Sequence, residues 1–417
     1  MSEDEFVEVV ASEELFSFIP AAKFSITAGF DAMKLKRYLI DFKGRNSSLL
    51  EKYEQADKVG QGTFGEVFRG RCKKTGMTVA LKRFTHDRSS GFPIADLREV
   101  LLLRRVSPLS FVAELVEVIK HVDDNANEIQ YLMVMPCYAA DLAALLANKQ
   151  YTLNAAEKKT IFKQILLGLS NLHLMKIIHR DLKTTNILLS SEGTVKIADF
   201  GLSRPYNAVY TSFSPIVVTL WYRCPELLLG SSCYREEVDM WSAGCIFGEL
   251  INQWPILQGD TEIQQVRLIS NLCGAVNEET LPGFASYPLV ESEEMRVPKK
   301  GQNRLSQKFK LGGVEYLDLL EKLLVINPQK RLTASEALGH KYFEVAPPLL
   351  DDVRDAIVGT PASFFNHNMN NPSHRFQQQL RFEYNVWVAA EGKKRRSARL
   401  MDGGPPIKLK HMSKVLL

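Results

Sequence analysis

One stretch, residues 179–201, constrains this chain more than any other. It begins HRDLKTTN and ends ADFG, with a short apolar run between the two parts. Asp181 places a carboxylate where a loop could hold it beside a substrate hydroxyl, and Lys183 brings a cation within reach of a phosphoryl group. Asn186 and Asp199 offer two oxygen ligands of the kind that Mg²⁺ prefers. Because phosphoryl transfer depends on positioning and charge neutralisation more than on covalent chemistry, this set predicts a phosphoryl-transfer site.

The order H-R-D-L-K-x-x-N followed by D-F-G resembles the signature of the protein kinase family. Either half alone would be weak evidence for this family, whereas the two halves at this spacing are strong evidence. The resemblance implies that Asp181 is the catalytic base, that Lys183 contacts the moving phosphoryl group, and that Asn186 and Asp199 bind Mg²⁺. The D-L-K sequence is similar to that of serine/threonine kinases rather than tyrosine kinases. His179 is expected to be a buried, hydrogen-bonded structural residue and not a catalyst.

Two more motifs lie upstream. The sequence GQGTFGEV at residues 60–67 has closely spaced glycines, which let a hairpin backbone approach phosphate oxygens; an ordinary tight hairpin has the same pattern. No helix-opening glycine turn follows, which disfavours a dinucleotide-binding fold. Instead a strand-like run ends in VALK at Lys82, as in kinases. The resemblance implies that Lys82 holds the ATP phosphates and that Glu99 pairs with it.

The resemblance also implies an ATP site between two lobes. Met135 would be the gatekeeper, and the Pro136 carbonyl and Tyr138 amide would bond the adenine edge. Asp141 would accept a ribose hydroxyl, but it is also placed to be the N-cap of a helix over residues 142–148, and both interpretations stay open. The expected ATP-binding set is Val59, Gly60, Gln61, Gly62, Thr63, Phe64, Gly65, Val67, Ala80, Lys82, Met135, Pro136, Tyr138, Asp141 and Leu188.

The sequence PIADLRE opens a helix that is expected to begin at Pro93 and end at Val106, with proline near its first turn. It looks like the PITALRE and PSTAIRE helices on which cyclin-dependent kinases dock a cyclin, and is nearest the transcription-elongation branch. An amphipathic helix packed on its own sheet has the same pattern, which does not exclude docking. The resemblance implies a T- or K-like cyclin on this helix, whose docking swings Glu99 toward Lys82 and activates the chain.

The sequence VVTLWYRCPE at residues 217–226 resembles the segment of cyclin-dependent kinases that forms a pocket for a proline after the phosphoacceptor. Val218 is the residue that would form the pocket. Counting back places the activating phosphosite on Ser214, with Thr211 and Ser212 as competitors. Without a phosphate, the clamping arginines are expected to repel one another and leave the segment loose. The arginines at family positions are Arg98, Arg180 and Arg204.

The resemblance covers the chain from Tyr53 to Phe343 and implies an α+β, two-lobed kinase fold. A small lobe with an antiparallel sheet and one main helix would precede a larger, mostly helical lobe. A helix is expected from Ala155 to Leu174, and a buried ion pair between Arg331 and Glu226. The expected divisions are an N-terminal extension (1–52), a kinase domain (53–343) with a small lobe (53–139) and a large lobe (140–343), and a mobile C-terminal tail (344–417).

Composition limits the other possibilities. At 417 residues the chain exceeds one ordinary core, and 45% apolar with 24% charged residues describes a soluble globular protein. A net charge of +4 does not argue for nucleic-acid binding. Six cysteines without a C-x-x-C pair indicate reduced thiols. The acidic N-terminus and the lack of a long apolar run predict neither a signal peptide nor a membrane span.

The tail contains KKRR at residues 393–396, which favours nuclear import or binding to an anionic partner as much as it favours a solvated tail. We therefore expect a nuclear protein, with the cytoplasm as a second location. The resemblance implies a cyclin-dependent, proline-directed serine/threonine kinase that uses ATP and Mg²⁺ and acts on the C-terminal domain of RNA polymerase II. A cell-cycle or other proline-directed kinase is the alternative. A pseudokinase scaffold is disfavoured, because every catalytic position is filled.

Overall fold

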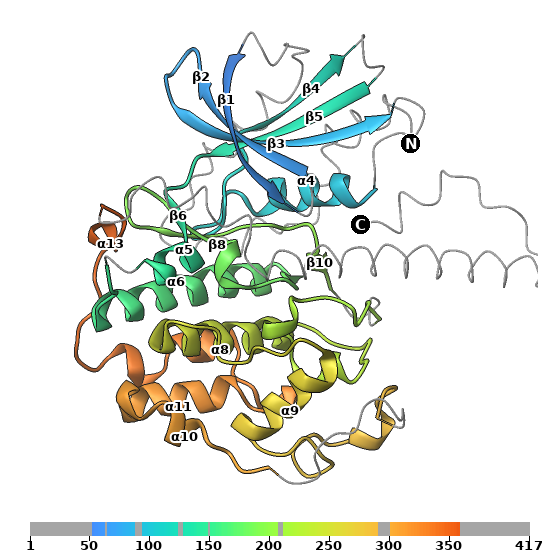
Figure 1. Cartoon of the computed structure of the whole chain (residues 1–417), viewed down its shortest axis with the longest axis vertical. Coiled ribbons are helices and arrows are strands. Elements are labelled where there is room, and N and C mark those ends of the chain that lie inside the picture. Colours follow the sequence, from blue (N-terminus) through green and yellow to red (C-terminus); the bar gives the residue numbers. More distant parts are fainter. Residues whose placement is uncertain are drawn as a thin grey trace, which may run out of the picture.

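The computed structural model describes residues 52–62, 65–87, 94–123, 128–148, 151–206, 212–290 and 301–358. They form a small lobe around a β-sheet and a larger helical lobe (Figure 1). This two-lobed α+β arrangement confirms the fold class expected from the sequence. Within the described ranges, none of the helices is both long and apolar enough to cross a membrane.

The small lobe is built on an antiparallel sheet of five strands in the order β1-β2-β3-β5-β4. Its main helix is α4 (Ile94–Val106). Tyr131 and Met133 of β5 pack into the core that α4 shares, whereas Leu132 and Val134 point to a second cluster on the other face. The strands are β1 (Tyr53–Gly62), β2 (Gly65–Cys72), β3 (Thr78–Asp87), β4 (Glu117–Asp123) and β5 (Glu128–Pro136).

The sheet curls until its two edge strands meet. Tyr53, at the start of β1, donates its hydroxyl to Glu117 of β4 at 2.8 Å, and Lys52 Nζ lies 2.6 Å from the same carboxylate. Because β1 and β4 are opposite edges of the sheet, these contacts close it over the second cluster. Strong twist of this kind is the ordinary behaviour of antiparallel strands.

Two long helices form the centre of the large lobe. They are α6 (Ala155–Leu174), which has the predicted bounds, and α8 (Glu237–Asn252). Asn154 and Glu157 form a capping box that begins α6. The remaining helices are α5 (Leu142–Ala147), α7 (Pro225–Leu228), α9 (Glu262–Cys273), α10 (Leu305–Lys308), α11 (Val314–Leu323), α12 (Ala334–Leu338) and α13 (Arg354–Val358).

Short strands and 3₁₀ turns complete the large lobe. The strands are β6 (Ala140–Asp141), β7 (Ile177–Ile178), β8 (Ile187–Leu189), β9 (Val195–Ile197) and β10 (Arg204–Pro205). The 3₁₀ turns are η3 (Thr184–Asn186), η4 (Leu220–Tyr222), η5 (Phe284–Ser286), η6 (Lys310–Gly312), η7 (Pro328–Lys330) and η8 (Lys341–Phe343).

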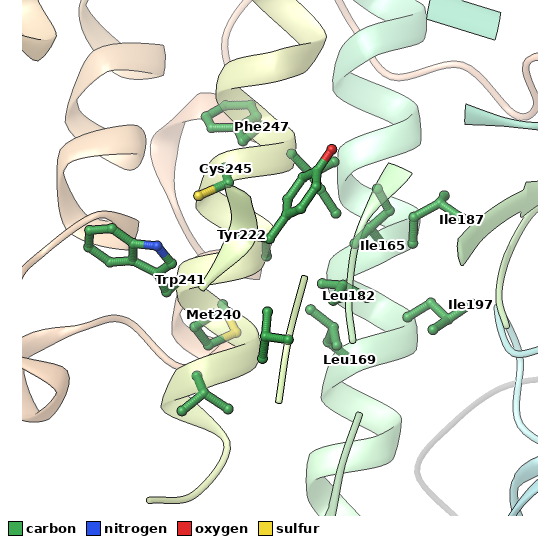
Figure 2. Packing of buried hydrophobic residues seen from close by; sticks show 14 of the residues in the cluster. Ile165, Leu169, Leu182, Ile187, Ile197, Tyr222, Met240, Trp241, Cys245 and Phe247 are labelled. Atoms are coloured by element: carbon green, nitrogen blue, oxygen red, sulfur yellow. The ribbon is translucent and has the colours of Figure 1, made fainter. Parts of the chain in front are cut away.

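The core of the large lobe anchors the loop that carries the predicted catalytic residues. Figure 2 shows Leu182 beside Leu169 of α6, with Ile187 nearby and Met240 of α8 on the other side. Leu182 and Ile187 are fully buried. Since Leu182 stands between Asp181 and Lys183 in the chain, its burial fixes the backbone from which those two side chains project.

A buried ion pair holds the lower part of the large lobe together, as the sequence predicts. Arg331 donates to both oxygens of Glu226, at 2.9 and 3.2 Å. Burial alone would lower the pKa of Arg331, but the Glu226 carboxylate raises it above its usual value. Bidentate geometry of this kind lets a buried pair offset the loss of its water.

The expectation of a mobile tail from residue 344 is wrong for its first part, because residues 344–358 pack on the large lobe. Lys159 of α6 donates to the carbonyls of Val345 and Pro347 at 2.5 and 2.9 Å. Val353 donates its N–H to Gly193 O at 3.1 Å and is buried. Apolar residues scattered among prolines and acidic residues have no helical or strand period, so only the surface of α6 reveals that this segment packs.

Candidate active site

The β1–β2 hairpin carries the glycine-rich sequence. Its register pairs Gly60 with Val67 and Gly62 with Gly65, which places the closely spaced glycines at the tip. Thr63 and Phe64, and the side chains of residues 59–62, lie outside the described part of the chain. Contacts between this hairpin and a nucleotide therefore stay a prediction.

Neighbouring strands bring the other small-lobe candidates onto one face of the sheet. Val67 of β2 lies opposite Lys82 of β3, and Ala80 of β3 lies opposite Met135 of β5. Ala80 and Lys82 are two residues apart on one strand, so their side chains point the same way. These four expected ATP-site residues thus share the face that Lys82 occupies.

The hinge between the lobes follows β5, which ends at Pro136. The N–H of Tyr138 donates no hydrogen bond within the described part of the chain, so it can donate to a ligand. The Tyr138 side chain turns elsewhere: its hydroxyl oxygen accepts from Glu114 N at 3.0 Å. Burial raises the pKa of Tyr138 to about 12, so the hydroxyl keeps its proton at neutral pH.

Asp141 is the N-cap of α5, which confirms one of its two interpretations. Its Oδ1 accepts from Ala144 N at 2.8 Å. Burial raises the pKa of Asp141 to about 6. Strand β6 pairs Asp141 with Leu188, which brings these two candidates together at the large-lobe side of the hinge. The second carboxylate oxygen leaves the ribose contact open as a prediction.

Glu99 of α4 and Lys82 of β3 form a buried ion pair. Burial disfavours the ammonium, but the carboxylates of Glu99 and Asp199 outweigh it and hold the pKa of Lys82 above its usual value. The pair is present in the single chain, whereas the sequence led us to expect Glu99 to reach Lys82 only after a partner docks. Glu99 Oε2 is buried with no hydrogen-bond partner among the described residues.

The carboxylate of Asp181 is held on both oxygens. Oδ2 accepts from Lys183 Nζ at 2.8 Å and from Asn186 Nδ2 at 3.2 Å. Oδ1 accepts from the amide and the hydroxyl of Thr219, at 3.2 and 2.9 Å. Asp181, Lys183 and Asn186 therefore meet as the sequence predicts, and Thr219 joins the same group from the segment after Ser214.

Helix α8 fixes this loop through Asp239. The two carboxylate oxygens accept from His179 N at 2.8 Å and from Arg180 N at 2.9 Å, and His173 Nε2 lies 3.0 Å away. Burial would raise the pKa of Asp239, but the hydrogen bond and charge of His173 lower it, so it stays ionised. Arg180 adopts a φ of 67°, a left-handed conformation that surrounding contacts must hold.

His179 is a buried structural residue, as expected. Its Nε2 lies 2.9 Å from the carbonyl of Ala198, and its ring packs edge-on against Phe200 with centroids 5.2 Å apart. The histidine thereby connects the catalytic loop to the DFG sequence.

The two expected metal ligands come from adjacent segments, because Ala198, the residue before Asp199, donates its N–H to Asn186 O at 2.9 Å. Asp199 Oδ1 is buried and has no hydrogen-bond partner within the described ranges. A carboxylate oxygen in that state costs free energy unless a cation meets it. Asn186 uses its amide nitrogen on Asp181, and its side-chain oxygen is an acceptor as well. These two residues fit a Mg²⁺ ion that completes its ligands with phosphate and water.

Val218 adopts a left-handed φ of 66°, which is an outlier for a β-branched residue. Its carbonyl accepts from Nε and Nη2 of the buried Arg223, at 3.1 and 3.0 Å. Arg223 is held in turn by Glu262 of α9. The Val218 oxygen is therefore turned into the protein.

Two of the three expected clamp arginines converge. Arg180 Nε and Arg204 Nη1 both donate to the carbonyl of Leu202, at 2.7 and 3.4 Å. Arg98, on α4, is half-buried. A clamp that includes all three stays a prediction.

Ser214 is buried, and its carbonyl accepts from the Tyr234 hydroxyl at 2.6 Å. The same hydroxyl accepts from Arg180 Nη1 at 2.9 Å. Tyr234 thus connects a clamp arginine to the segment without a phosphate, whereas we expected an unphosphorylated segment to be loose. Thr211 lies outside the described residues, and Ser212 is exposed.

Some important side chains were not predicted as site residues. Thr219 supports Asp181, Asp239 supports the loop, and Glu249 of α8 accepts from Thr184 Oγ1 and Tyr222 Oη at 3.2 and 2.6 Å. Burial raises the pKa of Glu249 to about 7. The available signal for Glu249 was its position as a polar residue in the otherwise apolar sequence GCIFGEL of α8.

Comparison with known proteins agrees with this geometry. The protein kinase domain model matches residues 53–343. Human cyclin-dependent kinase 9 is 38% identical over 326 residues, covering 76% of this chain and 87% of the relative. Probable cyclin-dependent kinase 9 of Caenorhabditis elegans is 37% identical over 364 residues, covering 77% and 75%.

Among solved structures, the yeast RNA Pol II CTD kinase CTDK-1 complex contains a chain that is 35% identical, with a TM-score of 0.66. The match covers 74% of this chain and 97% of that one. The motif residues, the fold and these identities agree, and the chain belongs to the protein kinase family, among the cyclin-dependent serine/threonine kinases.

Proposed function

We propose that this kinase phosphorylates Ser-Pro repeats in the C-terminal domain of RNA polymerase II. The relatives named cyclin-dependent kinase 9 and the similarity to a yeast RNA Pol II CTD kinase support this substrate. The structural observation that carries the proposal is the conformation of Val218, because it bears on the substrate residue that follows the phosphoacceptor.

A left-handed Val218 gives its carbonyl to Arg223, so this oxygen cannot accept a hydrogen bond from a bound peptide. A substrate residue with an N–H at that position would lose its bond to water without a replacement. Proline has no N–H and loses nothing. The segment therefore favours a proline after the phosphorylated serine or threonine.

In the proposed reaction, Asp181 orients the serine hydroxyl and accepts its proton as the oxygen attacks the γ-phosphorus of ATP. The bond from phosphorus to the bridging oxygen breaks, and ADP leaves. Lys183, 2.8 Å from Asp181, neutralises charge on the phosphoryl group, and Lys82, oriented by Glu99, holds the α- and β-phosphates. Fixing these groups before substrate binds is the main source of catalysis for such a transfer.

The nucleotide would lie between the lobes, with its adenine edge on the Pro136 carbonyl and the Tyr138 amide. Asn186 and Asp199 would hold Mg²⁺, which neutralises phosphate charge when it is bound. The unpartnered, buried Asp199 Oδ1 is the observation that favours a cation there.

The proposed partner is a T- or K-like cyclin on α4, and the proposed location is the nucleus. Because Glu99 already pairs with Lys82 in the single chain, docking would stabilise this arrangement rather than create it. Both the helix that carries Glu99 and the relatives' names support the partner.

Ser214 is the proposed activating phosphosite. It is buried, so an activating kinase must first open the segment. A phosphate would bring nearly two charges to Arg180 and Arg204, each charge-assisted bond contributing about 1.5 to 3 kcal/mol. Ser214→Ala should lower activity about tenfold or more, and Ser214→Glu should restore part of it. Ser212→Ala, at an exposed neighbouring serine, is the control; a normal rate in Ser214→Ala would reject Ser214.

The function is tested with the cyclin complex and three peptides: a polymerase repeat, the same repeat with Ala in place of the proline after the serine, and an unrelated Ser-Pro peptide. We expect the first to exceed the second about tenfold or more in kcat/KM. Asp181→Asn serves as the inactive control. Equal rates on the first two peptides would contradict proline selectivity, and a strong preference for the unrelated peptide would favour another proline-directed kinase.

A further inference from the structure

The loop after α4, residues 107–116, belongs to the small lobe in sequence but is bonded to the large lobe. Ala113 N donates to Ile197 O at 2.8 Å, and Ile197 N donates to Phe111 O at 2.9 Å. Phe111 adopts a φ of 63°, a left-handed conformation held in place by these bonds. Asn171 of α6 donates to the Ser110 carbonyl at 3.3 Å. The loop that follows α4 is therefore fixed to β9 and α6.

Helix α6 approaches this loop so closely that it leaves no room for a side chain. A Cβ added at Gly168 would lie 3.0 Å from Phe111 O and 2.7 Å from Ile197 Cδ1. Contacts at this distance leave the loop little freedom to slide along the large lobe. Any movement of α4 relative to that lobe must then pivot near its C-terminal end and move Glu99, near the middle of the helix, farther than the last turn.

Three side chains from separate elements meet at this pivot. Tyr138 of the hinge accepts Glu114 N on its hydroxyl oxygen at 3.0 Å. The Glu114 carboxylate pairs with Lys196 of β9 at 3.1 Å. We call Tyr138, Glu114 and Lys196 the hinge latch. It joins the hinge, the loop after α4, and the strand that leads to Asp199.

We infer that Tyr138 is a positioning residue that couples nucleotide binding at the hinge to the position of α4. The inference rests on the proposed nucleotide site in one respect, since it requires adenine to bind beside Tyr138. A ligand on the Tyr138 amide restrains the same residue whose hydroxyl holds Glu114. That restraint passes to the pivot of α4 and favours the position in which Glu99 meets Lys82.

Coupling of this kind is reciprocal: whatever steadies α4 must also tighten nucleotide binding. The hydroxyl carries most of the effect, because it bonds the main chain of the loop directly, at Glu114 N. The Glu114–Lys196 pair is partly exposed, with 38% of the Glu114 side chain accessible, and contributes less.

The test is amide hydrogen exchange of the full chain with and without saturating ADP and Mg²⁺, with the ADP Kd measured for every variant. In the wild-type chain, nucleotide should slow exchange in residues 94–106 about fivefold or more. Tyr138→Phe keeps the amide but loses the hydroxyl, so most of that slowing should disappear at saturation. Tyr151→Phe removes a hydroxyl that donates to Glu157 at 2.5 Å, at the start of α6, and should behave as wild type.

Lys196→Met is the second variant and should lose a smaller share of the slowing in the same direction, even if Tyr138→Phe fails to fold. Wild-type slowing in both Tyr138→Phe and Lys196→Met would overturn the inference, as would an equal loss in Tyr151→Phe. Failure of the wild-type chain to bind ADP would instead reject the nucleotide site itself, and the inference with it.

Discussion

The catalytic loop, residues 179–186, is bonded to the large lobe through many groups, whereas Glu99 reaches the site through one ion pair. Asp239 accepts two loop amides, and Asp181 is held on both oxygens by three residues. Glu99, by contrast, pairs only through Oε1, and its Oε2 has no hydrogen bond among the described residues.

This difference means that one region forms the catalytic loop and another controls activity. The loop is formed by the same buried contacts that stabilise the large lobe, so it should remain in place whenever that lobe is folded. The Lys82–Glu99 pair depends on where α4 lies relative to the sheet. A partner or a nucleotide that shifts α4 can therefore change activity without rebuilding the catalytic loop.

The largest effect should come from Asp199→Asn, which removes the proposed metal charge but little volume. We expect kcat to fall by at least about a hundredfold, because the metal is needed to neutralise the phosphates. Thermal stability should not fall, since the variant relieves a buried, unpartnered carboxylate oxygen. Asp260→Asn, at an exposed site, is the control. Retention of more than about a tenth of the wild-type rate would reject the assigned role.

Asp239→Asn should damage both stability and activity. The amide nitrogen would face a main-chain N–H in place of an acceptor, leaving a buried donor unsatisfied. We expect a loss of about 3 kcal/mol in the free energy of unfolding by denaturant titration, and a fall in kcat as the loop loosens. A normal kcat in a stably folded variant would show that the loop does not depend on α8.

Glu99→Gln should lower activity while leaving stability nearly unchanged. Activity should fall about tenfold or more, because Lys82 loses the partner that orients it. The free energy of unfolding should change by less than about 2 kcal/mol, since the Asp199 carboxylate still offsets the charge of Lys82. A loss of stability as large as that of Asp239→Asn would remove the contrast between the two regions.

Glu249 gives an effect on stability that depends on pH. Burial raises its folded pKa to about 7 from its usual value of 4.5, so the folded state holds the proton more tightly than the unfolded state. Its stabilising contribution is complete below about pH 4.5 and is lost as pH rises toward 7, by at most about 3 kcal/mol. In denaturant titrations, Glu249→Gln should therefore gain stability relative to wild type between pH 5 and pH 8. Parallel pH profiles would contradict the assignment.

The sequence predicted the elements of this site where a motif spells out the chemistry. Asp181, Lys183 and Asn186 meet as expected, and α6 has the predicted bounds. Motif residues of this kind are close in sequence or lie on one strand face, so spacing alone brings them together.

The supporting residues were harder to predict because their partners are distant in sequence. Asp239 meets His179 and Tyr138 meets Glu114 only once the chain is folded, and nothing local in the chain indicates those pairs. The packing of residues 344–358 likewise depends on a surface that α6 provides. The left-handed Val218 is a tertiary effect as well, since Arg223 holds its carbonyl.

The contrast between the two regions is tested most directly by the rate of phosphate transfer to a Ser-Pro peptide, measured for the purified chain alone and with its cyclin, at saturating ATP and peptide. Amide exchange of residues 179–186 and 94–106 is recorded on the same samples. We predict that the cyclin raises kcat about tenfold or more and slows exchange in residues 94–106, while exchange in residues 179–186 stays the same. Equal rates with and without cyclin, or slowed exchange in the catalytic loop, would contradict this account.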